Sequence, residues 1–173
     1  MAAQSVVASM RVALSINETL TTGLASGNLS TSLVPDLEWV TGNTAVANGI
    51  NQIFCKSAST VTLNGGANTT YTLTSLTDDA GVSRSFANGV RGLVIYVTSR
   101  SAGDYLTVGG AASNAWTGLV NSNTAVLRVY DFAAFGVTKT DKLTVTANSS
   151  EQIKITNAGN SAITFKLAVW GNT

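Results

Sequence analysis

The chain has 173 residues, only 11% of them charged, and a formal net charge of +1. It contains no histidine and one cysteine, which excludes histidine-based catalytic triads, histidine metal sites and an internal disulfide. The balanced charge gives no basic excess for gripping nucleic acid. Ser, Thr and Asn make up about a third of the residues, which favours a structural or adhesive β-protein over a soluble enzyme.

A long strand is predicted near the N-terminus. Apolar residues recur at every second position, namely Val6, Ala8, Met10, Val12, Leu14 and Ile16. Period-two alternation over a dozen residues is typical of a half-buried strand, since a helix would not keep these positions on one face. The chain start, Met1–Ser5, has no basic region and no continuous apolar run follows it, so we expect neither a secretory signal nor a membrane span, and synthesis in a cytoplasm.

The pattern breaks down from Glu18 to Gly49, where Gly-containing turn clusters surround Pro35. We expect a long irregular connection there with one short strand at Leu37–Val40. Such a connection tethers the first strand loosely, so residues 1–49 are predicted to form a strand or arm followed by a long loop.

Several strands are predicted after residue 50, at Ile50–Cys55, Val61–Leu63, Tyr71–Leu76, Ser83–Phe86, Leu93–Val97, Tyr105–Val108 and Val126–Phe132. Asp78–Gly81 reads as a tight turn with glycine in the left-handed region. Leu93–Val97 is apolar at both parities, which predicts a central strand covered on both sides. In the last third, alternation around residues 142–147, 152–156 and 163–170 predicts a three-strand meander.

Nine or ten short strands with turns every 8–12 residues predict an all-β fold, an antiparallel β-sandwich of the jelly-roll kind. We place this sandwich domain at residues 50–173, with the N-terminal strand or arm before it.

The sequence offers little chemistry. Asp36 and Glu38 would point to one side of an extended segment, as a glycosidase pair might, but we expect them to be a solvated loop pair. No nucleophile-elbow, zinc-protease or phosphate-loop motif occurs. We therefore expect no enzyme, no catalytic residue, no cofactor and no metal site.

Aromatic residues are the better candidates for contacts. Trp170 is predicted beside Lys166 on the polar side of the last strand, where it would suit a sugar platform or a protein interface. Trp116 lies in a predicted loop and Trp39 in the long connection. Packing beneath a neighbouring loop is the alternative for Trp170 and Trp116. Lys142, Lys154 and Lys166 are predicted on one face of the last three strands, either to meet an acidic partner or simply as a solvated face.

Parts of the chain resemble small structural proteins encoded among the virion genes of tailed bacteriophages. The residues that carry the resemblance are Leu76–Gly81, Phe86, Leu93–Ile95 and Val108–Trp116, and the similarity covers roughly Ile50 to Gly171. The chain departs from that pattern between Val126 and Val137, where Tyr130–Phe135 replaces a Pro/Gly-rich stretch. The resemblance implies a capsid decoration or cement protein, often trimeric and jelly-roll-like.

From this we expect a non-enzymatic virion protein on the capsid surface, assembled in the host cytoplasm, with the major capsid protein and itself, as a homotrimer, for partners. The alternative is a carbohydrate-binding module, or a fibre or tail component that uses exposed Trp residues. Nucleic acid and membrane are not expected partners. The residues expected at interfaces are Val6, Met10, Val12, Leu14, Trp39, Trp116, Lys166 and Trp170.

Overall fold

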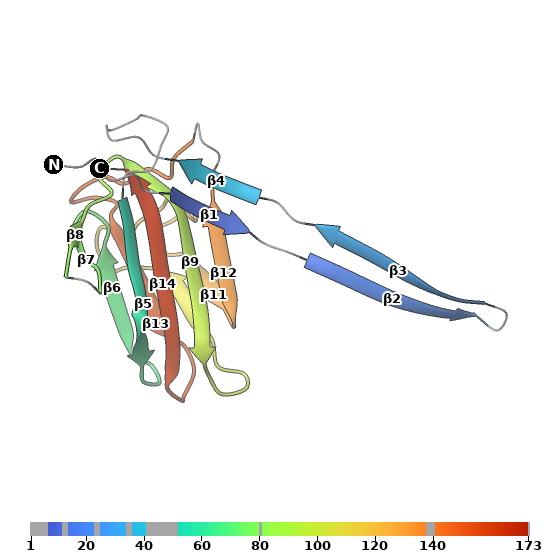
Figure 1. The fold of residues 1–173 in the computed structure, drawn as a ribbon. Helices are drawn as coiled ribbons and strands as arrows, with labels where there is room; N and C mark the ends of the chain where they lie inside the picture. The colour runs from blue at the N-terminus through green and yellow to red at the C-terminus, as the bar shows by residue number, and fades with distance from the viewer. Residues whose placement is uncertain are drawn as a thin grey trace.

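The computed structural model describes residues 7–11, 14–22, 25–33, 36–40, 52–79, 81–137 and 141–172. Within these residues the protein is all-β and contains no helix, which confirms the predicted class. Two antiparallel four-stranded sheets pack face to face as a β-sandwich (Figure 1). One sheet has the order β12-β9-β14-β5, the other β11-β10-β13-β6.

The eight sandwich strands are β5 (Gln52–Leu63), β6 (Asn68–Thr72), β9 (Gly89–Ser99), β10 (Leu106–Gly109), β11 (Val126–Val129), β12 (Phe132–Gly136), β13 (Gln152–Asn157) and β14 (Ile163–Asn172). Along the chain, every connection between successive sandwich strands changes sheet except the one from β10 to β11. Strands that follow each other in sequence therefore mostly lie in opposite layers.

The core lies between the two sheets and is built by alternate residues of each strand. Leu93 and Ile95 on β9 and Phe165 on β14 are fully buried, and Ile153 and Ile155 on β13 face them from the other sheet. Each such side chain contributes roughly 1.5–3 kcal/mol by leaving water. The alternation that predicted these strands is thus the alternation that builds the core.

A small hairpin, β7 (Leu76–Thr77) and β8 (Ser83–Arg84), closes the predicted turn. Gly81 has a φ of 77°, in the left-handed region that glycine adopts without strain. The buried carboxylate of Asp78 accepts a hydrogen bond from the Val82 amide at 2.8 Å and pairs with Arg84 at 3.0 Å. The turn expected from the sequence is confirmed, and its carboxylate is used for structure.

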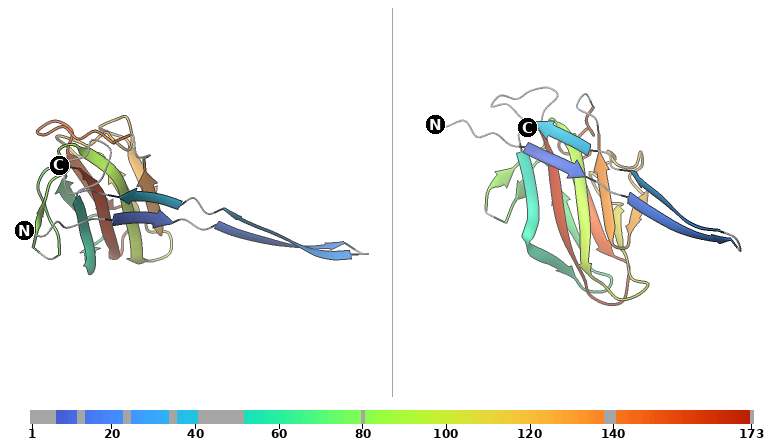
Figure 2. Two further views of the ribbon diagram at one scale, coloured as in Figure 1. Left: turned by 45° about the horizontal axis from the view of Figure 1, so that its top comes forward. Right: turned by 45° about the vertical axis from the view of Figure 1, so that its right-hand side comes forward.

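The N-terminal region differs from the expected irregular connection. β1 (Val7–Arg11) pairs with β4 (Asp36–Val40), and β2 (Leu14–Thr22) pairs with β3 (Ala25–Leu33) over nine residues each. The β2–β3 pair, called the distal ribbon below, projects away from the sandwich in every view (Figures 1 and 2).

The long loop predicted for Glu18–Gly49 is therefore wrong over Glu18–Thr22 of β2 and over β3, whereas the short strand predicted at Leu37–Val40 is confirmed within β4. Residues 41–50 lie outside the described part. Ser, Thr, Asn and Gly resemble turn clusters when read in isolation, but Thr is β-branched and suits a strand. Backbone pairing between β2 and β3 is a long-range event that such a pattern does not encode.

The expected C-terminal meander is also wrong. Residues 142–147 contain only isolated bridges, such as Val90 to Leu143, and β13 and β14 lie in different sheets. Alternation tells which residues of a strand share a face, but it does not select the neighbouring strand.

Candidate functional site

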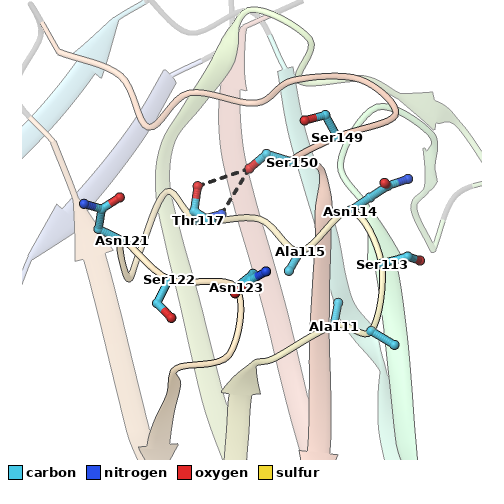
Figure 3. A pocket seen from close by; sticks show the side chains of 11 residues that line it. Ala111, Ser113, Asn114, Ala115, Thr117, Asn121, Ser122, Asn123, Ser149 and Ser150 are labelled. Atoms are coloured by element: carbon cyan, nitrogen blue, oxygen red, sulfur yellow. Dashed lines mark hydrogen bonds between the residues drawn. The ribbon is translucent and has the colours of Figure 1, made fainter.

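A loop pocket of about 360 Å³ opens at one end of the sandwich, between the β10–β11 connection and the turn before β13 (Figure 3). It is lined by Ala111, Ala112, Ser113, Asn114, Ala115, Thr117, Asn121, Ser122, Asn123, Ser149 and Ser150. These residues carry amides, hydroxyls and methyl groups, and none is charged. The pocket therefore suits a neutral, hydroxyl-rich ligand better than an ion.

The pocket wall is held by the backbone of Asn114, whose φ of 50° turns the loop sharply. Its carbonyl accepts hydrogen bonds from the amides of Glu151 and Gln152, both at 2.9 Å. Across the pocket, the Thr117 amide donates to the Ser150 hydroxyl at 3.1 Å (Figure 3). These bonds tie the two loops together, so the pocket is formed before any ligand arrives.

Glu151 supports the turn at the pocket edge. Its buried carboxylate accepts hydrogen bonds from the Thr74 hydroxyl and from the Asn148 amide, the latter at 3.0 Å. Asn148 itself has a φ of 59°. The carboxylate is thus occupied in fixing a strained turn, away from the pocket lining.

The outer face of the β12-β9-β14-β5 sheet, called the aromatic face below, has nonpolar side chains in its middle rows and the hydrogen-bonded hydroxyls of Thr98 and Thr164 toward one end. Tyr96 on β9 stands between Phe132 of β12 and Lys166 of β14 in the strand register. The neighbouring register row consists of Ala134, Val94 and Ala168. Tyr96 and Phe132 are each 52% exposed.

The outer face of the opposite sheet is polar. Thr107 on β10 lies between Arg128 and Thr156, and Lys154 on β13 lies beside Thr70. A polar outer face is what an antiparallel sheet needs when it contacts water. The contrast marks the aromatic face as the surface that is built for contact.

The sequence of β9 bears on this difference between the two outer faces. Leu93–Val97 predicts a strand covered on both sides, and its inner residues Leu93 and Ile95 are indeed buried. On the outer side, however, Tyr96 is exposed and Val94 half-buried. Both sides of β9 are thus covered over Gly89–Leu93, and the predicted cover of the outer side is lost toward Tyr96.

A charged and aromatic cluster lies at the end of the same sheet. Arg100 pairs with Asp131 at 2.9 Å, and this hydrogen bond holds the pKa of the Asp131 carboxyl below its ordinary value. The Arg100 guanidinium also lies over the ring of Tyr130. The Tyr130 ring contacts the ring of Tyr105, and the guanidinium of Arg128 lies over the Tyr105 ring. A hollow of about 470 Å³ beside Arg100 and Asp131 is shallow and open. The charges of Arg100 and Asp131 neutralise each other, so the lining of this hollow has no net charge to attract an ion.

Two predicted contact residues are corrected by the structure. Trp116 is only 4% exposed, and its ring nitrogen donates to the Thr144 carbonyl at 2.8 Å. Trp170 is only 5% exposed, and its ring lies over Gly92. Neither can serve as an exposed platform. As the alternation of β14 predicts, Trp170 lies on the side of the sheet that faces away from the core. Its ring is nevertheless buried, because glycine at position 92 has no side chain and leaves room for the ring against the sheet.

The remaining predicted residues have mixed outcomes. Lys166 is half-buried on the aromatic face. Met10 pairs with Leu37 in the β1–β4 ladder, and the register puts Trp39 on the same face. Leu14 begins the distal ribbon, while Val6 and Val12 lie outside the described residues.

The expected common face of Lys142, Lys154 and Lys166 does not exist. Lys154 and Lys166 lie on the outer faces of opposite sheets, because β13 and β14 belong to different layers. Conversely, sequence reasoning missed Phe132 and Tyr96 as surface residues. Their only signal was parity: Tyr96 alternates with the core residues Ile95 and Val97, as an outward residue must.

No group of three metal-ligating side chains capable of holding an ion occurs among the described residues. That part of the chain also has no helix long and apolar enough to cross a membrane. No protein-family model, curated protein or solved structure matches the chain.

Proposed function

We propose that this chain is a non-enzymatic structural protein of a tailed-phage virion, a decoration or cement protein that binds the capsid surface as a homotrimer and stabilises the head. The observation that carries the proposal is the distal ribbon, which extends outside the sandwich (Figure 1). An isolated two-stranded ribbon is marginally stable in water, so a projecting one needs a partner surface. Catalysis does not require a projecting ribbon, whereas assembly with other protein copies does.

The strand order supports a jelly-roll assignment for the sandwich. Eight strands form two four-stranded sheets, and the chain changes sheet at nearly every connection. Jelly rolls of this kind occur in viral capsid and lectin domains. The fold alone does not select between these two uses.

Stabilisation of a head would follow from mass action. A protein that binds only the assembled shell, with the major capsid protein as its partner, lowers the free energy of that shell relative to its separated subunits. The low charge of the chain limits repulsion between copies packed on one surface.

Immunogold labelling tests the location. Antibody to the purified protein is applied to phage particles released from the organism whose genome encodes the chain. Gold on the heads supports the proposal. Gold confined to tails or fibres supports the tail-component alternative, and unlabelled particles overturn a virion role.

A test for activity accompanies it. The purified protein should not turn over chromogenic glycosides or esters. Turnover that disappears in Asp36→Asn or Glu38→Gln would overturn the non-enzymatic assignment.

Binding of a neutral carbohydrate is the second candidate function, and the uncharged lining of the loop pocket is the observation that favours it. Saturation-transfer NMR with a panel of common mono- and disaccharides tests it. Binding that is lost in Asn121→Ala and Asn123→Ala, but retained in the distant Asn160→Ala, supports a glycan site. Absence of binding, or binding unaffected by the two pocket variants, counts against it.

A further inference from the structure

We propose that the distal ribbon of one copy docks on the aromatic face of a second copy, with Glu18 of the ribbon paired to Lys166 of the acceptor sheet. This inference deepens the self-association in the proposed function and rests on it. The inference is tested by the molar mass of the protein in solution, so the result does not depend on where the assembly lies on a virion.

The ribbon has two chemically distinct faces. In the β2–β3 register Leu14 opposes Leu33, and Glu18 opposes Leu29. Opposed residues share a face, and every second residue joins them, so Ile16 and Leu20 belong to that face as well. The other face holds only Ser, Thr and Asn, at Ser15, Asn17, Thr19, Thr21, Ser26, Asn28, Ser30 and Ser32. The first face thus combines five Leu and Ile residues with Thr22, Thr31 and Glu18, whereas the other face is polar throughout.

The backbone of the distal ribbon extends away from the sandwich of its own copy. Figures 1 and 2 show β2 and β3 extending beyond the sheets in each view. Nine residues at about 3.4 Å each give the ribbon a length of roughly 30 Å. A nonpolar stripe of that length exposed to water would favour association with a surface of matching character.

The aromatic face is such a surface. Tyr96 and Phe132 are half-exposed on it, and Val94, Ala134 and Ala168 add small nonpolar groups. The outer sides of β9 and β14 are open only from Val94 to Ser99 and from Ile163 to Ala168, since the remaining residues of both strands are buried throughout. The acceptor therefore contacts the middle of the ribbon. β9 also has the composition of a strand covered on both faces, and its outer side supplies the uncovered half.

Charge complementarity favours the pairing of the distal ribbon with the aromatic face. Glu18 is the only charged residue of β2 and β3, and it lies in the middle of the ribbon's apolar face. Lys166 lies in the middle row of the aromatic face, and no ion-pair partner for it occurs among the described residues. One negative group on the donor therefore meets one positive group on the acceptor.

A second copy of this chain is the occupant that these features fit. Each copy has one ribbon and one aromatic face, so each gives one contact and receives one. A head-to-tail contact of this kind generates a ring when the rotation between successive copies closes, and a closed ring of three copies is the homotrimer of the proposed function.

A charge swap tests the proposal. Molar mass is measured by light scattering and sedimentation for the full chain and for Glu18→Lys, Lys166→Glu and the double swap. Each single reversal puts like charges together and should weaken association by tenfold or more. The double swap should restore it to within about threefold of the unaltered chain. Lys154→Glu, on the polar face of the opposite sheet, is the matched control and should leave the mass unchanged.

Hydrogen exchange gives a second readout on the same proteins. The ribbon amides should be protected in the oligomer and exchange rapidly in the single variants, while the core strands stay protected in all of them. Far-ultraviolet circular dichroism spectra that match the spectrum of Lys154→Glu establish that the variants fold. The proposal is overturned by a monomeric unaltered chain, by single reversals that leave the mass unchanged, or by a double swap that restores neither association nor protection.

Discussion

The side chain of Asn157, at the end of β13, donates a hydrogen bond of 2.9 Å to the backbone carbonyl of Leu63, 94 residues earlier at the end of β5. These strands belong to different sheets, so the bond joins the two layers at one end of the sandwich. The same amide donates to the Ser161 carbonyl at 2.7 Å, and its oxygen accepts from the Gly159 amide. Asn157 is fully buried, and its three bonds fix both the layer contact and the turn into β14.

Replacing Asn157 by Ala should therefore destabilise the fold. Two carbonyls lose their donor in a buried place, which lowers the free energy of unfolding by about 2–4 kcal/mol. Urea unfolding followed by circular dichroism measures the change. Asn160→Ala, at an exposed position in the same turn, should change the free energy by less than about 0.5 kcal/mol. Equal effects of the two substitutions would contradict the role given to Asn157.

The contact between Gly92 and Trp170 predicts a second effect. A Cβ at position 92 would overlap the Trp170 ring. Gly92→Ala should lower the free energy of unfolding by about 1–3 kcal/mol, because a buried ring has to be displaced. In a Trp170→Leu background the same substitution should cost much less, and this non-additivity in denaturant unfolding identifies the contact. Additive effects would mean that the ring is not the obstacle.

The pair of Arg100 and Asp131 gives a prediction about pH. The Arg100 hydrogen bond lowers the pKa of Asp131, so any stabilisation from this pair is present above the ordinary carboxyl pKa and is lost as pH falls through the lowered value. NMR titration of the side-chain carboxyl should show the lowered pKa, and Arg100→Gln should raise it toward its ordinary value. Because Asp131 is exposed, salt should reduce the difference. A pKa unchanged by Arg100→Gln would refute the pairing.

The burial of two tryptophans predicts their fluorescence. In Trp39→Phe, the emitting residues are Trp116 and Trp170, both almost inaccessible to water. Emission should lie at short wavelength and resist quenching by iodide. Strong quenching by iodide, or a change in the emission on adding sugars, would mean that these residues are exposed platforms after all. Trp116→Phe should in addition cost about 1 kcal/mol, since the hydrogen bond to the Thr144 carbonyl is lost.

Much of the candidate site lay beyond the reach of sequence reasoning. Lys166 was identified as a contact residue because β14 alternates, and alternation is a local property. Tyr96 and Phe132 were not singled out, since their prominence depends on β9 and β12 being neighbours and on nothing described covering their outer face. The loop pocket joins Asn114 to Ser150, residues far apart in the chain, and no spacing rule connects them.

The amino-acid sequence by itself determined the all-β class, most sandwich strands and the turn at Asp78–Gly81, because alternation and turn chemistry act within a few residues. Only the tertiary structure decided that β13 and β14 separate into two sheets, that β2 and β3 pair as a projecting ribbon, and that Trp170 lies flat over Gly92. These outcomes depend on which distant segments become neighbours. The packing of whole sheets decides which segments become neighbours. A strand whose apolar residues alternate can pair with several partners equally well, and only the filled core between the two layers selects one of them.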